Sequence, residues 1–158
     1  MDRDQFIAQV KTQQNALRSF LLALCGGNLA AADDIAQESL VKAYLAIDRY
    51  TDSGKFKSWL FKIAHNTFLN HTAALKQYDS IEAAETVATQ ESADHNFAHQ
   101  QLYLALSTLP PKERAAITLY YLSGYSIKEI AAITEVNADA VKKQLSRGRD
   151  RLKQLIKP

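Results

Sequence analysis

The chain has 158 residues, 47% hydrophobic and 23% charged, with five glycines and three prolines, a composition that favours an all-α protein of one domain or two small ones. The formal net charge of +2 does not by itself indicate a class of partner. The N-terminus is polar and no apolar run approaches the roughly 20 residues that cross a bilayer, so we expect no signal peptide, no membrane insertion and a cytoplasmic location.

Three helices are predicted in the first part of the chain, over about residues 6–24, 31–47 and 56–76. The first ends at Gly26-Gly27-Asn28, residues that tolerate the positive φ common at helix ends. A polar turn at residues 51–54 separates the second helix from the third. We expect the three helices to form one domain, residues 1–77, in which the single cysteine, Cys25, is a buried packing residue.

The predicted third helix carries three side chains in a stripe on one flank: Trp59, Lys62 and Asn66. A flat aromatic ring, a cation and an amide together suit stacking on an unpaired base and hydrogen bonding to the base and its phosphate. The alternative is that Trp59 packs at the edge of the core and Lys62 is only solvated, because aromatic residues at helix edges are common in cores.

Charge is distributed along the chain in blocks. Residues 54–78 hold four lysines and no carboxylate, whereas residues 78–95 hold five acidic residues and no lysine or arginine. Residues 141–158 hold seven Lys or Arg and one Asp. We predict that residues 78–94 form a linker, because this acidic segment has little periodicity. Two basic blocks around an acidic one predict two nucleic-acid-facing modules.

The second module, residues 95–158, has the pattern of a helix-turn-helix. Two helices are predicted at its start, over about residues 95–106 and 112–122. Ser126, with Glu129 three residues later, then marks the capped start of another helix, Val136 lies in the next turn, and Asn137 caps the last helix. Apolar residues on both sides of the turn predict two crossing helices, of which the second enters the major groove of DNA: Ile127, Ile130, Ala131, Val141 and Leu145.

The predicted last helix has an outward face that can contact DNA. The side chains that can reach base edges are Asp139, Lys143, Ser146 and Arg147. The side chains on the flanks, where phosphates would lie, are Lys142, Arg149 and Arg151. We expect Gly148 to allow the close approach of a neighbouring helix. The alternative for the whole set is an ordinary solvated basic helix.

Three stretches of the chain, in two blocks, resemble the extracytoplasmic-function (ECF) sigma factors of bacterial RNA polymerase. Residues 32–44 (ADDIAQESLVKAY) and 56–66 (FKSWLFKIAHN) resemble region 2 of that family, and residues 109–152, which begin LPPKER, resemble region 4. The two blocks occur in the family's order. The resemblance implies a bacterial protein with two small helical domains and no catalytic activity, which binds core RNA polymerase and gives it promoter specificity.

The resemblance also implies a role for each region. Region 2 would bind the clamp helices of the polymerase β′ subunit and open the −10 element, and region 4 would bind the β flap and read the −35 element. The candidates for core binding are Asp34, Gln37 and Glu38. The candidates for the −10 element are Tyr50, Ser53, Lys57, Trp59, Lys62 and Asn66. The seven polar residues of the last helix become the −35 candidates, and an anti-sigma factor is an expected partner.

The chain departs from the family in the helix-turn-helix. Glu135 stands where the family usually has glycine, Gln144 where it often has arginine, and Ala140 where it often has threonine. A non-glycine residue with positive φ costs on the order of 1 kcal/mol, so we expect an adjusted turn. These changes leave open which DNA sequence is read.

Two other functions fit part of the pattern. One is a helix-turn-helix regulator that binds an operator as a dimer, and the other is a sigma-like interaction protein without promoter activity. No cofactor or metal is expected: His95 and His99 have the i, i+4 spacing of zinc ligands, but no third ligand lies in good register. Binding to core polymerase would separate the sigma factor from the operator-binding regulator.

Overall fold

The structure is a computed structural model that describes residues 1–51, 54–77 and 97–156. Every regular element in these ranges is helical, which confirms the all-α prediction. The elements are α1 (Arg3–Leu24), α2 (Leu29–Leu45), the 3₁₀ turn η1 (Ile47–Arg49), α3 (Phe56–Gln77), α4 (Phe97–Ser107), α5 (Pro111–Ile117), the π-helical turn η4 (Thr118–Leu122), α6 (Ile127–Thr134) and α7 (Ala138–Ile156). The predicted linker, residues 78–94, and the candidates Ser53 and His95 lie outside the described residues.

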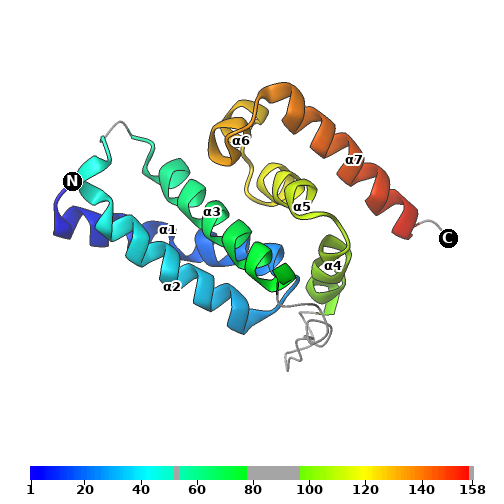
Figure 1. Ribbon diagram of the computed structural model, residues 1–158, viewed down its shortest axis with the longest axis horizontal. Coiled ribbons are helices and arrows are strands. Elements are labelled where there is room, and N and C mark those ends of the chain that lie inside the picture. Colours follow the sequence, from blue (N-terminus) through cyan, green and yellow to red (C-terminus); the bar gives the residue numbers. More distant parts are fainter. Residues whose placement is uncertain (52–53, 78–96, 157–158) are drawn as a thin grey trace.

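Helices α1, α2 and α3 form the first half of the protein and pack against one another. Asp2 caps α1 in a capping box with Gln5, and the Asn28 side chain caps α2 by accepting from the backbone N–H of Ala31, so Asn28 starts the second helix as well as following the first. Figure 1 shows α3 running alongside α1 and α2, on the side that faces the rest of the chain. This central position of α3 determines what its side chains can reach.

Elements α4 to α7 form the second half, in which α6 and α7 make the predicted helix-turn-helix. The Ser126 hydroxyl accepts from the Glu129 backbone at 3.1 Å and the Glu129 carboxylate accepts from the Ser126 backbone at 2.8 Å, which confirms the capping box. The predicted cap at Asn137 is also confirmed, since its side chain accepts from the Ala140 N–H at 2.8 Å. A Cβ on Gly148 would lie 2.7 Å from Ile117 Cγ1, so α5 does approach α7 closely there.

The turn between α6 and α7 keeps the left-handed conformation that usually needs glycine. Glu135 has φ 61° and ψ 40°, and within the described residues it is the only non-glycine residue with a positive φ. The expectation of an adjusted turn was therefore wrong. The backbone N–H of Val136 donates to Ala131 O at 3.1 Å, which closes the end of α6.

The two halves share one continuous cluster of buried apolar side chains. The Phe61 ring on α3 stacks on Phe20 of α1, with centroids 5.0 Å apart, and also meets the edge of Tyr125 in the second half at 5.8 Å. Helix α3 is thus packed against α1 and α2 on one side and against α6 on another (Figure 1).

A second contact between the halves lies at the end of α1. The Arg114 guanidinium of α5 donates to the carbonyl of Leu24 at 2.5 Å and to that of Leu109 at 2.9 Å, and its burial lowers the pKa of the guanidinium. A Cβ on Gly26 would lie 3.0 Å from Ser107 Cβ of α4, so glycine at this turn permits the contact. In the described part of the chain no helix has the length and apolar character required to cross a membrane.

Candidate nucleic-acid interface

An aromatic cluster forms where the turn after α2 meets the start of α3. The ring of Tyr50 lies 4.9 Å from that of Trp59, and both contact Phe56, at 5.8 and 5.7 Å between centroids. Tyr50 is buried, while Trp59 is half-buried and lines a cavity of about 260 Å³ with Lys55 and with Ala132 of α6. Trp59 therefore packs on the edge of the core, as the alternative interpretation expects, and part of its ring remains accessible; its role in base stacking stays a prediction.

The two lysines proposed for the −10 element are engaged by the second half. Lys62 Nζ lies 3.1 Å from Glu135 Oε2, and Lys57 Nζ lies 5.1 Å from the centre of the Tyr125 ring. Burial raises the pKa of the Tyr125 hydroxyl well above its ordinary value, so this ring presents its face to the lysine as a neutral phenol. Asn66 is exposed. The structure thus brings Trp59 and Lys62 to one cavity, while Lys57 points to a different neighbour.

The proposed −35 surface on α7 is open. Side chains of all seven candidates are exposed: Asp139, Lys142, Lys143, Ser146, Arg147, Arg149 and Arg151. The last two contact other elements of the second half: Arg149 donates to the Tyr121 hydroxyl at 3.3 Å, and Arg151 donates to Glu113 at 2.8 Å. Arg147 lines a groove of about 450 Å³ with Lys112 and with Leu69 of α3, so it projects toward the seam between the halves.

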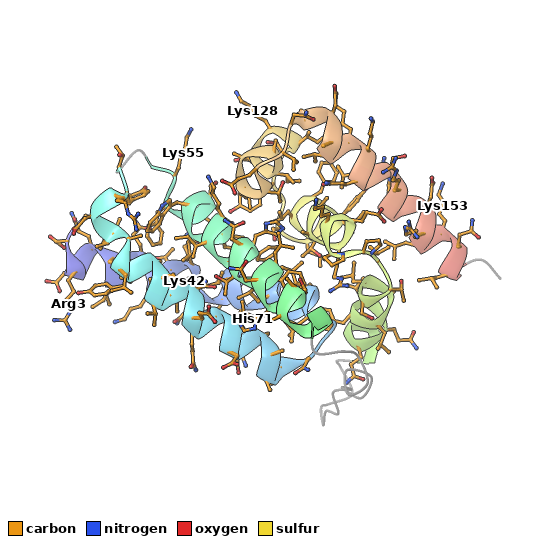
Figure 2. The ribbon with its side chains drawn as sticks, viewed as in Figure 1. Arg3, Lys42, Lys55, His71, Lys128 and Lys153 are labelled. Atoms are coloured by element: carbon orange, nitrogen blue, oxygen red, sulfur yellow. The ribbon has the colours of Figure 1, made fainter. Side chains whose placement is uncertain are left out.

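The candidates for core binding lie on the exposed face of α2. Asp34, Gln37 and Glu38 are exposed. Glu38 pairs with Lys42 at 3.1 Å and with His71 at 2.9 Å, and hydrogen bonds from His71 first and Lys42 second lower its carboxyl pKa. Figure 2 labels Lys42 and His71, which come from α2 and α3. Lys42 and His71 therefore lie on the same face of the first half as Glu38.

An apolar strip on the same helix was not among the predicted binding surfaces. Leu45 is 74% exposed and Val41 59% exposed, next to the half-exposed Tyr44. Exposed large apolar residues one turn apart on a helix are typical of a protein-binding surface. The signal was present in the sequence, because Val41 and Leu45 are i, i+4 neighbours and lie outside the buried positions of α2, which are Ala32, Ile35, Ser39 and Ala43.

His65, to which the sequence pattern assigned no role, lies on α3 at the junction with the second half. His65 is 3% exposed, and neither ring nitrogen has a hydrogen-bond partner among the described residues. Burial lowers its pKa to about 4, while Glu135 acts in the opposite direction and Lys112 adds to the lowering. It lines a cavity of about 290 Å³ between α3 and the helix-turn-helix. The described residues contain no cluster of three or more side chains suited to a metal ion.

Comparisons with known proteins match both halves of the chain. The family model described as Sigma-70 region 2 matches residues 10–77, and that described as Sigma-70, region 4 matches residues 99–152. The ECF RNA polymerase sigma factor SigM of Bacillus subtilis is 35% identical over 129 residues, covering 78% of each chain. The ECF RNA polymerase sigma factor EcfG of Rhodopseudomonas palustris is 29% identical and covers 98% of this chain and 84% of its own.

A solved structure is similar over both halves at once. The sigma factor RpoE from Bartonella quintana, in complex with the anti-sigma factor NepR, superposes with a TM-score of 0.80 at 28% identity, and the match covers 98% of each chain. The relative placement of the two halves described above is therefore found in that protein too.

Proposed function

The chain belongs to the ECF sigma factors of the sigma-70 family, and from this premise we propose how it works: it binds core RNA polymerase and directs it to promoters. The observation that carries the proposal is the presence in one chain, in the family's order, of a region 2 with an aromatic and basic surface on α3 and a region 4 with an open basic helix, α7. A sigma factor is not an enzyme, since the core polymerase performs the chemistry.

We assign the tasks to residues as follows. Residues 1–77 bind the β′ clamp helices and the −10 element, residues 95–158 bind the β flap and the −35 element, and residues 78–94 join them. Core binding is assigned to Asp34, Gln37 and Glu38. The −10 element is assigned to Tyr50, Ser53, Lys57, Trp59, Lys62 and Asn66, and the −35 element to Asp139, Lys142, Lys143, Ser146, Arg147, Arg149 and Arg151.

The chemistry of each surface supports its assignment. Base stacking needs an accessible aromatic ring, which Trp59 offers, and a nearby cation for the phosphate, which Lys62 offers. Reading a duplex needs a helix that can enter the major groove with polar side chains projecting from it, which α7 offers at Lys143 and Arg147.

An anti-sigma factor is a further proposed partner. The support is that the placement of the halves is similar to that of RpoE, which was solved in complex with its anti-sigma factor. The proposed location is the bacterial cytoplasm, because core polymerase and promoter DNA are there.

The test is transcription from genomic DNA by purified core polymerase with and without this chain, followed by sequencing of the transcript 5′ ends. We expect new start sites that share elements at −10 and −35. An operator-binding regulator would instead bind duplex DNA without core polymerase and create no start sites. A sigma-like interaction protein would bind core polymerase and also create none.

A further inference from the structure

We propose that the seam between the halves binds a nucleoside monophosphate, with its phosphate at Lys112 and Arg147 and its base in the cavity at His65. Two adjoining cavities, a buried imidazole without a partner and two unpaired cations support this site. The inference goes beyond the proposed function, because its ligand is a small metabolite rather than DNA or polymerase.

The two cavities form one elongated space along the seam. The smaller, of about 290 Å³, lies against His65 and Val136, and the larger, of about 450 Å³, lies against Pro111 and Arg147. The residues that line both are Leu69, Lys112 and Gln144. Pockets for small molecules measure roughly 300–1,000 Å³, so the space has the size of a ligand site.

The smaller cavity contains a buried polar group without a partner. His65 is 3% exposed, and neither ring nitrogen hydrogen-bonds to any residue that the structure describes. Burial lowers its pKa to about 4, so near neutral pH the ring is uncharged and offers one N–H donor and one acceptor nitrogen. Leaving such a group unpaired is costly, and native structures rarely do so. The imidazole therefore needs an occupant of the cavity that can both donate and accept.

Two amide side chains at the same cavity can recognise the edge of a base. Gln144 is half-buried on α7 and Asn66 is exposed on α3, and neither side chain forms a hydrogen bond within the described part of the chain. An amide presents a donor and an acceptor side by side, which matches the edge of a nucleobase. Leu69 and Val136 line the cavity with apolar groups that can contact the faces of a flat ring. The uncharged part of the ligand is therefore a base.

The larger cavity has unpaired positive charge. Lys112 and Arg147 line it, and neither has an ion-pair partner among the described residues. Glu113 lines it too, but its carboxylate already bonds to an arginine of α7 at 2.8 Å. The Glu135 carboxylate at the smaller cavity is likewise paired, with a lysine of α3 at 3.1 Å. An ammonium and a guanidinium that are both unpaired suit a phosphate group.

The proposed ligand shares one residue with the −35 surface. Arg147 is a −35 candidate, so a phosphate bound there would compete with duplex DNA for the same guanidinium. This consequence rests on the proposed function, whereas binding of the nucleotide to the free chain does not.

Isothermal titration calorimetry of the full-length chain with AMP, GMP, CMP and UMP tests the site. We expect at least one of them to bind with a Kd below about 1 mM. The matching nucleoside and inorganic phosphate should each bind at least roughly tenfold more weakly, because each makes only part of the contacts. No saturable binding of any of the four, or equally tight binding of inorganic phosphate, would overturn the inference.

Lys112→Gln tests the phosphate end of the site. It removes one cation and keeps a polar side chain, so the nucleotide affinity should fall roughly tenfold, as expected for the loss of one hydrogen bond to a charged group. The matched control is Lys128→Gln, which removes an exposed lysine from α6 (Figure 2) and should bind the nucleotide as the wild type does. Equal affinities in the two variants would contradict the site.

The base end of the site is tested by NMR of the histidine rings in the wild-type protein. The chain has four histidines, and the spectrum of His65→Leu identifies the ring nitrogens of His65. Saturating nucleotide should shift these resonances, and unchanged resonances would refute contact with His65 and overturn the inference. A chain that binds the nucleotide but directs no transcription retains this inference and refutes the proposed function. A chain that directs transcription without binding any of the four nucleotides does the reverse.

Discussion

Helices α3 and α7, the two that carry the proposed DNA-binding residues, are placed in opposite ways. Helix α3 lies between α1 and α2 on one side and α6 on another, and two of its lysines contact the second half. Helix α7 runs along the edge of the molecule with its basic face exposed (Figure 1). Access to α3 therefore depends on how the halves are arranged, whereas access to α7 largely does not.

This difference matches the two kinds of DNA that the helices would meet. A duplex is present before transcription starts, so a helix that reads its groove can remain exposed. Unpaired bases are present only after the strands open, so a stacking surface is needed later. Helix α3, which is covered, is thus the one that would bind unpaired bases, and these are absent while the DNA is still double-stranded.

The largest expected effect comes from removing the partly buried Arg114 contact between the halves. Arg114 donates to Leu24 in the first half and to Leu109 in its own half. Hydrogen bonds to a charged group contribute about 1.5–3 kcal/mol each, so Arg114→Ala should cost about 3 kcal/mol and uncouple the halves. Trp59, the single tryptophan, reports urea unfolding of the first half by fluorescence, and circular dichroism reports both halves.

The two probes should give one transition in the wild type and two different midpoints in Arg114→Ala. Arg149→Ala is the matched control, because Arg149 bonds to Tyr121 within its own half. It should leave the probes coincident. Coincident transitions in Arg114→Ala would mean that the shared apolar cluster alone couples the halves.

The next effect is a loss of DNA binding or strand opening, which should depend on whether the template is double-stranded or pre-melted. Arg147→Ala should weaken recognition at defined −35 positions by about 1–3 kcal/mol if the side chain makes a bidentate base contact. Trp59→Ala should spare closed-complex binding and impair strand opening, since stacking on an unpaired base contributes about 1–3 kcal/mol. Binding and permanganate footprinting with holoenzyme would measure both.

A pre-melted template gives the decisive control. On it the Trp59→Ala defect should shrink and the Arg147→Ala defect should persist, while Lys153→Ala, an exposed change further along α7, should behave as wild type. Loss of helical circular dichroism in Trp59→Ala would instead show that the ring acts mainly in the core. Equal behaviour of the two variants on both templates would contradict the division between the helices.

Much of the second half could be predicted from the sequence because its signals are local. Three predicted features were confirmed: the helix caps at Ser126 and Asn137, and the close approach at Gly148. Each cap depends on residues within one helical turn, and the close approach depends on one neighbouring helix. Helix ends were less exact: α5 ends at Ile117 and continues as the π-helical turn η4, where one longer helix was predicted. The exact ends of a helix depend on tertiary packing, which cannot be read from the periodicity of the sequence.

The role of α3 was only partly predictable. Leu60 and Ala64 have the i, i+4 spacing of one buried helix face, but Phe61, His65 and Phe68 are buried as well. A residue is buried on a second side when another part of the chain, distant in sequence, packs there, and the pattern of one helix does not reveal that. Candidates for DNA contact on α3 could therefore be named from the sequence, and they stay predictions, whereas the contacts of Lys57 and Lys62 with the second half could not be foreseen.

A smaller effect concerns His65, the buried histidine of that second face. Its pKa is depressed to about 4 from the ordinary 6.5, so its burial stabilises the protein fully above about pH 6.5 and less as the pH falls toward 4. We expect a loss of about 2 kcal/mol in unfolding free energy between about pH 7 and pH 5, measured by urea titration. Lys112 facing His65 adds to this sensitivity, and Glu135 opposes it.

His65→Leu, which cannot titrate, should largely remove that pH dependence. His71→Gln is the control, because His71 is more exposed and pairs with Glu38 on another face. It should keep the loss seen in the wild type. An unchanged pH dependence in His65→Leu would show that other groups carry it.

The smallest effect on stability is expected from changes to the exposed carboxylates of α2. These changes also separate an effect on stability from an effect on core binding. Glu38 has two partners, Lys42 and His71, whereas Asp34 has no ion-pair partner within the described residues. Exposed pairs contribute about 0.2–1 kcal/mol, so Glu38→Gln should lower the unfolding free energy by that amount and Asp34→Asn should not change it. If both carboxylates contact the polymerase clamp, both variants should weaken core binding in a fluorescence titration despite their different stabilities. If only Glu38→Gln loses affinity, the ion pairs of Glu38 with Lys42 and His71, rather than the exposed charge of α2, support core binding.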